Sequence, residues 1–498
     1  MINLECFGRL RLIAMKKTLL NVTLALVSCT AAFAQLRVYR AAGAEIPTES
    51  GLTAALEPYL DQLAVEDKFS GTVVITKDGV PVFQKAYGLA SRAYNVPNRV
   101  DTKFNLGSMN KMFTAVAIAQ LVEQGKLSFD DPLIKVLPDY PNKEVAGKIT
   151  VHQLLTHTSG LGDYFNQQYF DASKARFKEV RDYFSLFVDQ ALLFPPGQRF
   201  SYSNAGFMVL GAVVEKVSGQ NYFDYVREHI YKPAGMTNTD AYDLEMDTPN
   251  MAIGYTRMNA DGSVSDGPRR NNLFLHVVKG GPAGGGFSTA EDLVRFAAAL
   301  SGHKLLTAHF TDIVYSGKVD QGRGGGKYAY GFEDEMFNGH RRIGHGGGFP
   351  GINSDLRIYP DLGYAVAVMS NYDPPAASRV ATRIGKLITG AAVPVAVTLA
   401  PEILQSCAGR YDADPNQRLN GSIEVAPTAG GLSVKFSGGG SASFATGLPH
   451  KFVPMSDIEF FDEEYEDIHV VFKKDMNGHA TGLEFKGPGP AGTAHKIG

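Results

Sequence analysis

An almost unbroken run of apolar residues spans positions 112–122 and predicts a buried helix. Small and branched apolar side chains recur in it at helical spacing, no proline interrupts positions 108–124, and Gly125 stands where a helix C-cap belongs. Because the run is apolar nearly all round, with no broad polar face, we expect this helix to lie inside the protein and not on its surface.

Alternating apolar and polar segments on both sides of this helix predict strands. A mostly helical, loop-rich block at 101–300 separates the two sets of strands. We therefore predict an α+β fold, in which one antiparallel sheet is built from both ends of the domain, is flanked by helices and carries an inserted helical region. The expected strands are 71–76, 80–87, 332–337, 341–344, 354–359 and 364–370, and the expected flanking helices are 52–63 and 376–388.

Beyond a boundary at 395–399 the pattern changes to short alternating segments, which are separated by turns such as Asn477-Gly478. We therefore predict a small separate β-domain, barrel-like in form, over residues 400–498. Its expected strands are 422–425, 432–436, 469–472 and 482–485.

The N-terminal segment is typical of a targeting signal. From Met15 it carries two lysines, an apolar stretch and the sequence Ala-Phe-Ala, which predicts cleavage after Ala34. We therefore assign residues 1–34 to a signal peptide whose true start is Met15, and residues 35–51 to a lead-in. A rival site exists, because Cys29 ends a sequence that resembles a lipobox and could carry a lipid anchor. The expected location is periplasmic or secreted, with an outer-membrane lipoprotein as the alternative.

The composition is that of a globular protein, with 44% hydrophobic residues, 20% charged residues and a net charge of −3. This mild acidity argues against nucleic acid as a partner, and no later apolar run is long enough to span a bilayer. His152 and His157 are not at zinc spacing, and the glycines of 322–326 lack the residues of a phosphate-binding loop, so we expect neither a metal nor a cofactor. Cys407 is expected to be a small buried residue.

Candidate chemistry stands at the start of the predicted helix. Ser108 precedes Lys111 by three positions, so a helix would place the hydroxyl and the amine on one face. Burial would favour the neutral amine and make Lys111 a proton acceptor, while the Ser108 N–H could donate to an oxyanion. The structural alternative is a helix N-cap beside a surface lysine. A second Ser-x-x-Lys, at 301–304, is followed by no long apolar helix, and we interpret it as a loop.

Two further clusters accompany this pair. Tyr202-Ser203-Asn204 lies at the centre of PPGQRFSYSNAGFMVLG, and His345 lies within the glycine-rich IGHGGGFPG. Neither cluster is diagnostic alone, because Tyr-x-Asn also recurs elsewhere in the chain. An aromatic group either lines a substrate cleft or packs in the core or a lid; its members are Tyr164, Phe165, Tyr169 and Phe170.

Taken in order, Ser-x-x-Lys, Tyr-x-Asn and His-x-Gly before a terminal strand resemble the serine β-lactamase and penicillin-binding-protein-like hydrolases. The flanking sequences TVHQLLTHTSGL, PAGGGFSTAEDLVRFAAAL and GHGGGFPGINSDLRIYPDLGYAVAVMSN agree with this resemblance. It covers residues 52–392, which would form a serine hydrolase domain. The nearest branch holds class C β-lactamases, family VIII carboxylesterases, D-aminopeptidases and D-stereospecific peptidases, and some of these carry a lipocalin-like domain, as expected here over 400–498.

The resemblance implies a role for each member of the first two clusters. Ser108 would be the acylated nucleophile and Lys111 its base or proton relay. Tyr202 would carry the proton to the leaving group and activate water for deacylation; because a phenol titrates near 10, it needs Lys111 beside it. Asn204 would either bind a substrate amide or help to hold Lys111.

The third cluster departs from the usual pattern. His345 stands where many relatives have the lysine of a Lys-Thr-Gly triad, Gly347 is the glycine of that triad, and the N–H of Gly348 would join that of Ser108 in an oxyanion hole. A neutral imidazole binds a carboxylate less well than an ammonium does. This argues against strong β-lactamase or D,D-carboxypeptidase activity and favours esters, or peptides recognised in another way. The structural alternative is that His345 caps the end of a strand.

The sequence thus predicts an exported serine hydrolase that acts through a Ser108 acyl-enzyme on an ester, amide or D-amino-acid peptide bond. The expected partner is a small ester or a short peptide. The alternatives are a slowly deacylating protein that binds or senses β-lactams or peptidoglycan peptides, a weak class C-like β-lactamase, and an inactive scaffold. The C-terminal domain would shape the active-site entrance, mediate oligomerisation or merely pack.

Overall fold

The computed structural model describes residues 48–259, 263–265, 267–322, 326–414, 419, 421–437, 449–487 and 491–497. The predicted signal peptide, including Met15, Cys29 and Ala34, lies outside the described residues, as do most of the predicted lead-in and positions 323–325 of the glycine-rich segment. None of the described helices combines the length and the apolar character that crossing a membrane requires.

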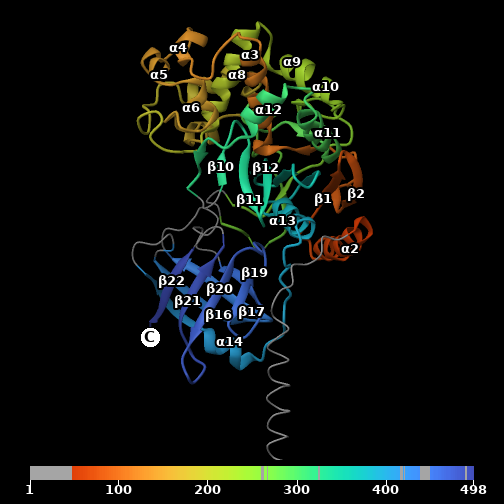
Figure 1. The fold of residues 1–498 in the computed structure, drawn as a ribbon, viewed down its shortest axis with the longest axis vertical. Helices are drawn as coiled ribbons and strands as arrows, with labels where there is room; N and C mark the ends of the chain where they lie inside the picture. Colours follow the sequence, from red (N-terminus) through yellow and green to blue (C-terminus); the bar gives the residue numbers. More distant parts are fainter. Residues whose placement is uncertain are drawn as a thin grey trace, which may run out of the picture.

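The main sheet has eight strands in the order β2-β1-β14-β13-β12-β11-β10-β9. β1 pairs antiparallel with β14, so strands from the two ends of the catalytic unit lie side by side (Figure 1). The antiparallel sheet predicted from the sequence is confirmed. Its strands are β1 (Gly71–Lys77), β2 (Val80–Tyr87), β9 (Val319–Asp320), β10 (Gly326–Tyr328), β11 (Glu333–Phe337), β12 (His340–Phe349), β13 (Ile352–Tyr359) and β14 (Tyr364–Ser370).

Successive side chains of β1 enter two different hydrophobic cores, because a strand points alternate residues to opposite faces of its sheet. Val73 and Ile75 belong to a core that also contains the apolar sides of α2 (Glu49–Val65) and α13 (Ala376–Ile388). Val74 belongs to the larger core on the other face, which the inserted helical region fills. The flanking helices predicted at 52–63 and 376–388 are thus present, the first of them longer at both ends.

The inserted region surrounds α3 (Asn110–Glu123), whose residues from Asn110 to Leu121 are all buried. Gly125 follows it with a φ of +68°, the left-handed conformation that glycine adopts at a helix end. The buried helix is confirmed, although Ser108 itself lies in the short 3-10 turn η1 (Gly107–Met109) that precedes α3. The other helices of the region are α4 (Leu133–Val136), α5 (Lys143–Lys148), α6 (Val151–Leu155), α7 (Gln167–Asp171), η2 (Lys174–Arg176), η3 (Val180–Leu186), α8 (Asn204–Ser218), α9 (Tyr222–Val226), η4 (Arg227–Tyr231), α10 (Lys232–Ala234), α11 (Ala290–Ser301) and α12 (Ala308–Tyr315).

Short paired segments complete the region around α3. They are β3 (Leu89–Ser91) with β4 (Val96–Pro97), β5 (Phe104–Asn105) with β8 (Phe287–Ser288), and β6 (Tyr255–Thr256) with β7 (Arg270–Asn271). The β5–β8 pair matters for the site, because it ties the segment just before Ser108 to the segment just after the glycines of PAGGG.

The glycine-rich segment is a strand, which the sequence did not predict beyond residue 344. β12 continues to Phe349 and pairs with β13 along its whole second half. The glycines are needed where β12 meets its neighbours: a Cβ on Gly344 would overlap the carbonyl oxygen of Leu356, and one on Gly347 would overlap that of Leu106. Since glycine is rare in strands, strand propensity alone could not identify this one.

The C-terminal part is a closed barrel of eight antiparallel strands, which confirms the predicted barrel-like form. Its interior is filled with apolar side chains that include Phe452, Phe460 and Phe472, and Cys407 is fully buried against them, as expected. Four strands and one helix were not predicted, partly because their segments begin or end with glycine, proline or charged residues. The elements are α14 (Pro401–Cys407), β15 (Gly409–Ala413), β16 (Ser422–Thr428), β17 (Gly431–Ser437), β18 (Pro449–Pro454), β19 (Glu459–Asp462), β20 (His469–Lys474), β21 (Ala480–Lys486) and β22 (Gly492–Ile497).

The barrel lies next to α13 (Figure 1), and ion pairs join the two. The guanidinium of Arg383 binds both carboxylate oxygens of Glu466, at 2.5 and 3.0 Å, and Lys386 lies 2.7 Å from Asp467. Glu466 is only 5% exposed, so the pair is largely removed from water. The barrel is therefore docked on the back of the catalytic unit, with α13 between it and the main sheet.

Candidate active site

Glycines on two sides hold the turn that carries Ser108. Gly107 has a φ of +51°, and its carbonyl accepts a hydrogen bond from the N–H of Gly285 at 3.1 Å. On the other side, a Cβ added to Gly107 would come within 2.9 Å of the backbone nitrogen of Gly348. Side chains at these positions would push the PAGGG loop and β12 away from the turn. The glycines thus bring the Ser108 turn close to the backbone of Gly348.

Lys111 is the second residue of α3, and its amine is directed at Ser108. Its Nζ is 3.2 Å from the Oγ of Ser108, 2.7 Å from the Oδ1 of Asn204 and 2.6 Å from the carbonyl oxygen of Ala283. The side chain is fully buried, and this burial lowers the pKa of Lys111 from 10.5 to about 7, although the charge of Asp163 acts in the opposite direction. The prediction of a desolvated lysine is confirmed, and a large fraction of Lys111 is neutral at neutral pH.

Asn204 is the first residue of α8, and Asp163 orients its side chain. One carboxylate oxygen of Asp163 accepts hydrogen bonds from both the backbone N–H and the Nδ2 of Asn204, at 3.2 and 2.8 Å. Because Nδ2 is a donor, the Oδ1 of Asn204 is left to accept from Lys111. Of the two roles expected for Asn204, the geometry supports contact with Lys111. No pattern in the sequence marked Asp163 beyond its place after the motif TSGLG.

Tyr202 lies two residues before the start of α8, beside both the lysine and a buried histidine. Its ring centre is 4.8 Å from the Nζ of Lys111 and 4.2 Å from the ring centre of His157. His157 accepts a hydrogen bond from the N–H of Ser203 at 3.1 Å, and complete burial holds its pKa well below the usual range. A neutral His157 therefore holds the Tyr-x-Asn segment in place through its hydrogen bond with Ser203 and its ring contact with Tyr202. This is consistent with the structural role expected for it.

His345 lies in the middle of β12, so the strand-end alternative is wrong. Burial lowers its pKa to about 4, which makes the ring neutral at pH 7. Its Nδ1 lies 2.5 Å from the carbonyl oxygen of Gly346 and must donate to it, so its Nε2 accepts from the hydroxyl of Tyr328 at 3.0 Å. Both ring nitrogens are thus bonded within the protein.

The two glycines after His345 differ in their surroundings. Gly348 lines the same cavity as Ser108, whereas neither Gly347 nor His345 is among its lining residues. The carbonyl of Gly347 instead accepts from the Nδ2 of Asn353 at 3.0 Å. The structure therefore brings Ser108 and Gly348 together at the cavity and places Gly347 and His345 behind its wall.

This cavity, the catalytic pocket, has a volume of about 200 Å³ and opens beside Ser108, Tyr202 and Asn204. Its outer wall is aromatic: Tyr164, Phe165 and Tyr169 line it, and the ring of Phe165 stacks on that of Phe349 with centres 5.8 Å apart. The sequence left open whether four aromatic residues line a substrate cleft or pack in the core or a lid, and these three line the cleft. The fourth, Phe170, is 55% exposed and does not line it.

The wall of the catalytic pocket contains no lysine, arginine, aspartate or glutamate among the described residues. Its histidine, His276, donates from Nδ1 to the carbonyl of Val277 at 3.0 Å, and burial lowers its pKa below the usual value. Within the described part of the chain, no three histidine, cysteine or acidic side chains gather as metal ligands would. The pocket therefore offers a hydroxyl, backbone N–H groups and apolar surface, without a fixed charge for a substrate carboxylate.

A profile of the Beta-lactamase family matches residues 56–391, which is more than half of the chain and includes Ser108, Lys111, Tyr202 and the β12 glycines. The chain belongs to the β-lactamase family. It is a serine hydrolase with the β-lactamase fold, and the eight-stranded barrel follows the matched region.

Individual relatives come from several branches of this family. The chain is 27% identical to penicillin-binding protein 4* of Bacillus subtilis over 327 residues, covering 64% of this chain and 71% of that protein. It is 34% identical to esterase EstB of Burkholderia gladioli over 200 residues, covering 38% of this chain and 51% of the esterase. The crystal structure of a penicillin-binding protein from Bacillus halodurans is 35% identical, with a TM-score of 0.59, and covers 66% of this chain and 99% of that one. Both hydrolytic and penicillin-binding relatives are thus represented.

Three contributors to the site were not predicted from the sequence. The carbonyl of Ala283 binds Lys111, Asp163 orients Asn204, and Tyr328 binds His345. Ala283 lies in the PAGGG segment, so the family resemblance drew attention to its surroundings but not to its contact. The other two are brought in by tertiary packing, and no local pattern marks them.

Proposed function

We propose that this family member hydrolyses esters or amides that lack a carboxylate through an acyl-enzyme on Ser108. The observation that carries the proposal is the 3.2 Å contact between the Oγ of Ser108 and a buried Lys111 whose pKa is about 7. Neutral Lys111 accepts the hydroxyl proton as Oγ bonds to the substrate carbonyl carbon. Lys111 is uncharged often enough at neutral pH to act, yet basic enough to take the proton.

The remaining residues fit the steps that follow. The backbone N–H groups of Ser108 and Gly348 donate to the carbonyl oxygen as it becomes negative, a type of stabilisation worth about a hundredfold in rate or more per donor. Tyr202 passes a proton to the leaving group, and later takes one from the water that attacks the acyl-enzyme. Its position beside Lys111 supports this role, because the nearby ammonium favours the phenolate.

The preference for substrates without a carboxylate follows from the wall of the catalytic pocket. A cationic side chain that would bind a substrate carboxylate is missing from its described lining, and His345 is neutral and already bonded. The aromatic wall favours apolar acyl groups. An esterase among the relatives supports this choice, and a weak β-lactamase activity is the second candidate, favoured by the penicillin-binding relatives.

Export belongs to the same proposal. The N-terminal signal pattern and the penicillin-binding relatives support a periplasmic or secreted enzyme, or a lipoprotein anchored at Cys29. The intact mass of the protein recovered from the producing cells distinguishes these cases, because cleavage after Ala34 and lipidation of Cys29 leave different N-termini. A protein that retains residues 1–34 would contradict both.

The test is turnover of a nitrophenyl acetate, nitrocefin and a D-alanyl anilide by the wild-type protein, by Ser108→Ala and by the matched variant Ser301→Ala. Ser301 belongs to the second Ser-x-x-Lys and ends α11, where it contacts Tyr315. We expect ester turnover to dominate, to disappear in Ser108→Ala and to persist in Ser301→Ala. Equal turnover by Ser108→Ala would overturn the assignment, and a burst without a steady state would indicate the slowly deacylating alternative.

A further inference from the structure

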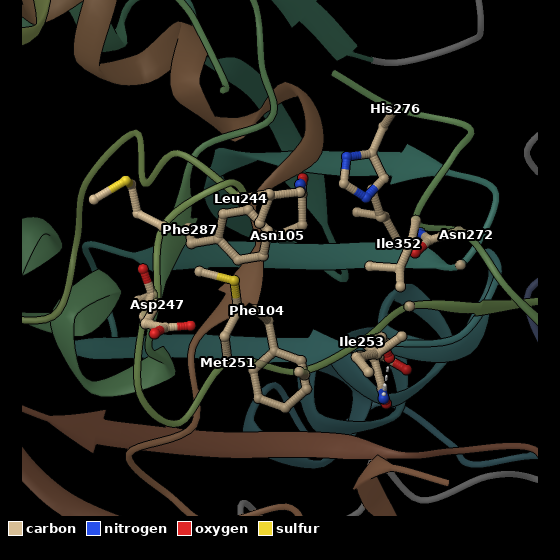
Figure 2. A pocket seen from close by; sticks show the side chains of 18 residues that line it. Phe104, Asn105, Leu244, Asp247, Met251, Ile253, Asn272, His276, Phe287 and Ile352 are labelled. Carbon is tan, nitrogen blue, oxygen red and sulfur yellow. Dashed lines mark hydrogen bonds between the residues drawn. The ribbon is translucent and has the colours of Figure 1, made fainter. Parts of the chain in front are cut away.

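A second cavity adjoins the catalytic pocket. It has a volume of about 260 Å³ and shares Asn105, His276 and Ile352 with the catalytic pocket as a common wall. We call it the side pocket. Figure 2 shows Phe104 and Asn105, from the segment that leads into Ser108, near its middle, with Asp247 to one side and Asn272 and His276 to the other. The two cavities are therefore direct neighbours.

The middle of the side pocket is apolar. Phe104, Met251 and Phe287 lie along it in Figure 2, between Asp247 at one end and Asn272 with His276 at the other. Such a surface stabilises a hydrocarbon chain by removing it from water.

Some of the described polar side chains in the side pocket carry hydrogen-bond acceptors that are not paired with donors. Asn272 is 1% exposed and Asn371 is 3% exposed; each uses its Nδ2 to bind backbone carbonyls, and each has a buried Oδ1 without a hydrogen-bond partner. A buried carbonyl oxygen without a donor costs free energy, which a ligand N–H or a water molecule would recover. Neutral His276 adds a third acceptor, because its Nδ1 already donates to Val277.

The carboxylate of Asp247 completes this pattern at the exposed end. The four groups accept hydrogen bonds, and one of them is negatively charged. Such a lining suits a group that donates hydrogen bonds and carries a positive charge at its end, and it disfavours a carboxylate or a phosphate.

We infer that the side pocket binds the acyl part of the substrate, and that this acyl part is an apolar chain that ends in an ammonium group facing Asp247. The inference rests on the proposed hydrolase function. The acyl part is assigned because the leaving group must depart beside Tyr202, which lines the catalytic pocket and not the side pocket. The chain then crosses the apolar middle of the side pocket toward Asp247.

The test compares matched nitrophenyl esters, whose acyl chains have two, four, six or eight carbons and end in either an ammonium or a methyl group. We expect the ammonium ester to exceed its methyl analogue about fivefold in kcat/KM at the best chain length, since an exposed carboxylate contributes modestly. This preference shrinks in 0.5 M salt, because salt screens charges at a surface. Equal kcat/KM for the two series at every length would overturn the inference.

Two variants locate the effect, and one serves as their control. Asp247→Asn is expected to bring the ratio of ammonium to methyl ester close to one. Glu245→Gln, on the same segment but outside the side pocket and paired with Lys178, is expected to keep the full ratio. Ala252→Phe fills part of the side pocket and is expected to shift the best chain length toward shorter esters. An unchanged ratio in Asp247→Asn would contradict the placement of the ammonium.

The acetyl ester separates this inference from the function on which it rests. It is too short to enter the side pocket and reports only on Ser108 chemistry. Turnover of the acetyl ester without any ammonium preference would refute the side-pocket inference alone. Failure to turn over any ester, with no acylation of Ser108, would refute the proposed function itself.

Discussion

At the scale of single residues, the reactivity of the site depends on the balance of two effects on Lys111. Complete burial lowers its pKa to about 7, and the charge of Asp163 opposes this without cancelling it. The neighbouring histidines, His157 and His345, have pKa values lowered by burial and carry no positive charge at neutral pH. Asp163 is therefore the one described anion that acts on Lys111, and it also fixes the amide of Asn204.

The first prediction concerns the pH dependence of the reaction. Because neutral Lys111 is the base, kcat/KM for an uncharged ester should fall as the pH drops below about 7, with about a tenfold loss for each further pH unit. Asp163→Asn removes a charge that raises the pKa of Lys111, so this acid limb should move to lower pH. A pH profile of the two proteins measures the shift, and Asp171→Asn, on exposed α7, is the control. A limb that stays in place, or moves to higher pH, would contradict the role of Asp163.

The second prediction concerns the packing of glycine behind the catalytic turn. A Cβ on Gly347 would overlap the carbonyl oxygen of Leu106, so Gly347→Ala should displace the Ser108 turn, lowering kcat by at least about tenfold and the free energy of unfolding by about 1–3 kcal/mol. Gly147→Ala is the matched control, because no heavy atom lies within 4 Å of a Cβ there and alanine favours its helix α5. Thermal unfolding and ester turnover of both variants provide the measurement. Wild-type turnover by Gly347→Ala would show that the turn tolerates the displacement.

At the scale of elements, the sequence predicted what local patterns encode. The hairpin β1–β2, the strand β14 and the helix α13 are amphipathic or regularly apolar, and their predicted bounds lie close to those observed. Ser108, Lys111 and Tyr202 were found because their spacing matches a family. The second half of β12 was missed because its glycines allow close backbone contacts with β13 and with Leu106, next to η1, and strand propensity does not reveal such contacts. Asp163 was missed because its contact with Asn204 depends on tertiary packing. No local pattern distinguishes this aspartate from the others in the chain.

The third prediction concerns the contact between α13 and the barrel. Arg383 and Glu466 form a bidentate pair in which Glu466 is 5% exposed, so Arg383→Met leaves a buried carboxylate with only the amine of Lys386, 3.7 Å away. We expect the variant to lose about 3 kcal/mol of stability. The double variant, which adds Glu466→Met, should recover most of this loss, because it removes the unpaired charge. Denaturant unfolding of the two variants tests the coupling, and equal stability of the single and double variants would contradict it.

At the scale of the whole molecule, the barrel and the catalytic unit are joined on the side of the sheet that carries α13, while Leu106 and Met109, on either side of Ser108, belong to the core on the opposite face. The described barrel residues do not line the catalytic pocket or the side pocket. The contact with α13 instead satisfies the charges of Arg379, Arg383 and Lys386. We therefore expect the barrel to act on stability more than on the chemistry of the described site.

The fourth prediction follows for a protein that ends near Val395. It should retain the relative kcat/KM values for acetyl and longer esters, because both pockets belong to the catalytic unit. Its unfolding temperature should fall, because α13 loses the carboxylates that pair with its buried cations. Turnover of the ester series and thermal unfolding test this. A changed ester preference would show that the barrel shapes the entrance, and a changed oligomeric state would assign it a role in assembly.

The central claim is that Ser108 is an activated nucleophile, and covalent labelling tests it most directly. The measurement is the intact mass of the protein after treatment with a fluorophosphonate, followed by peptide mapping, with Ser108→Ala and Ser301→Ala as comparisons. We predict a single adduct on Ser108, the same adduct in Ser301→Ala, and none in Ser108→Ala. An unlabelled wild-type protein, or an adduct that persists in Ser108→Ala, would contradict the account.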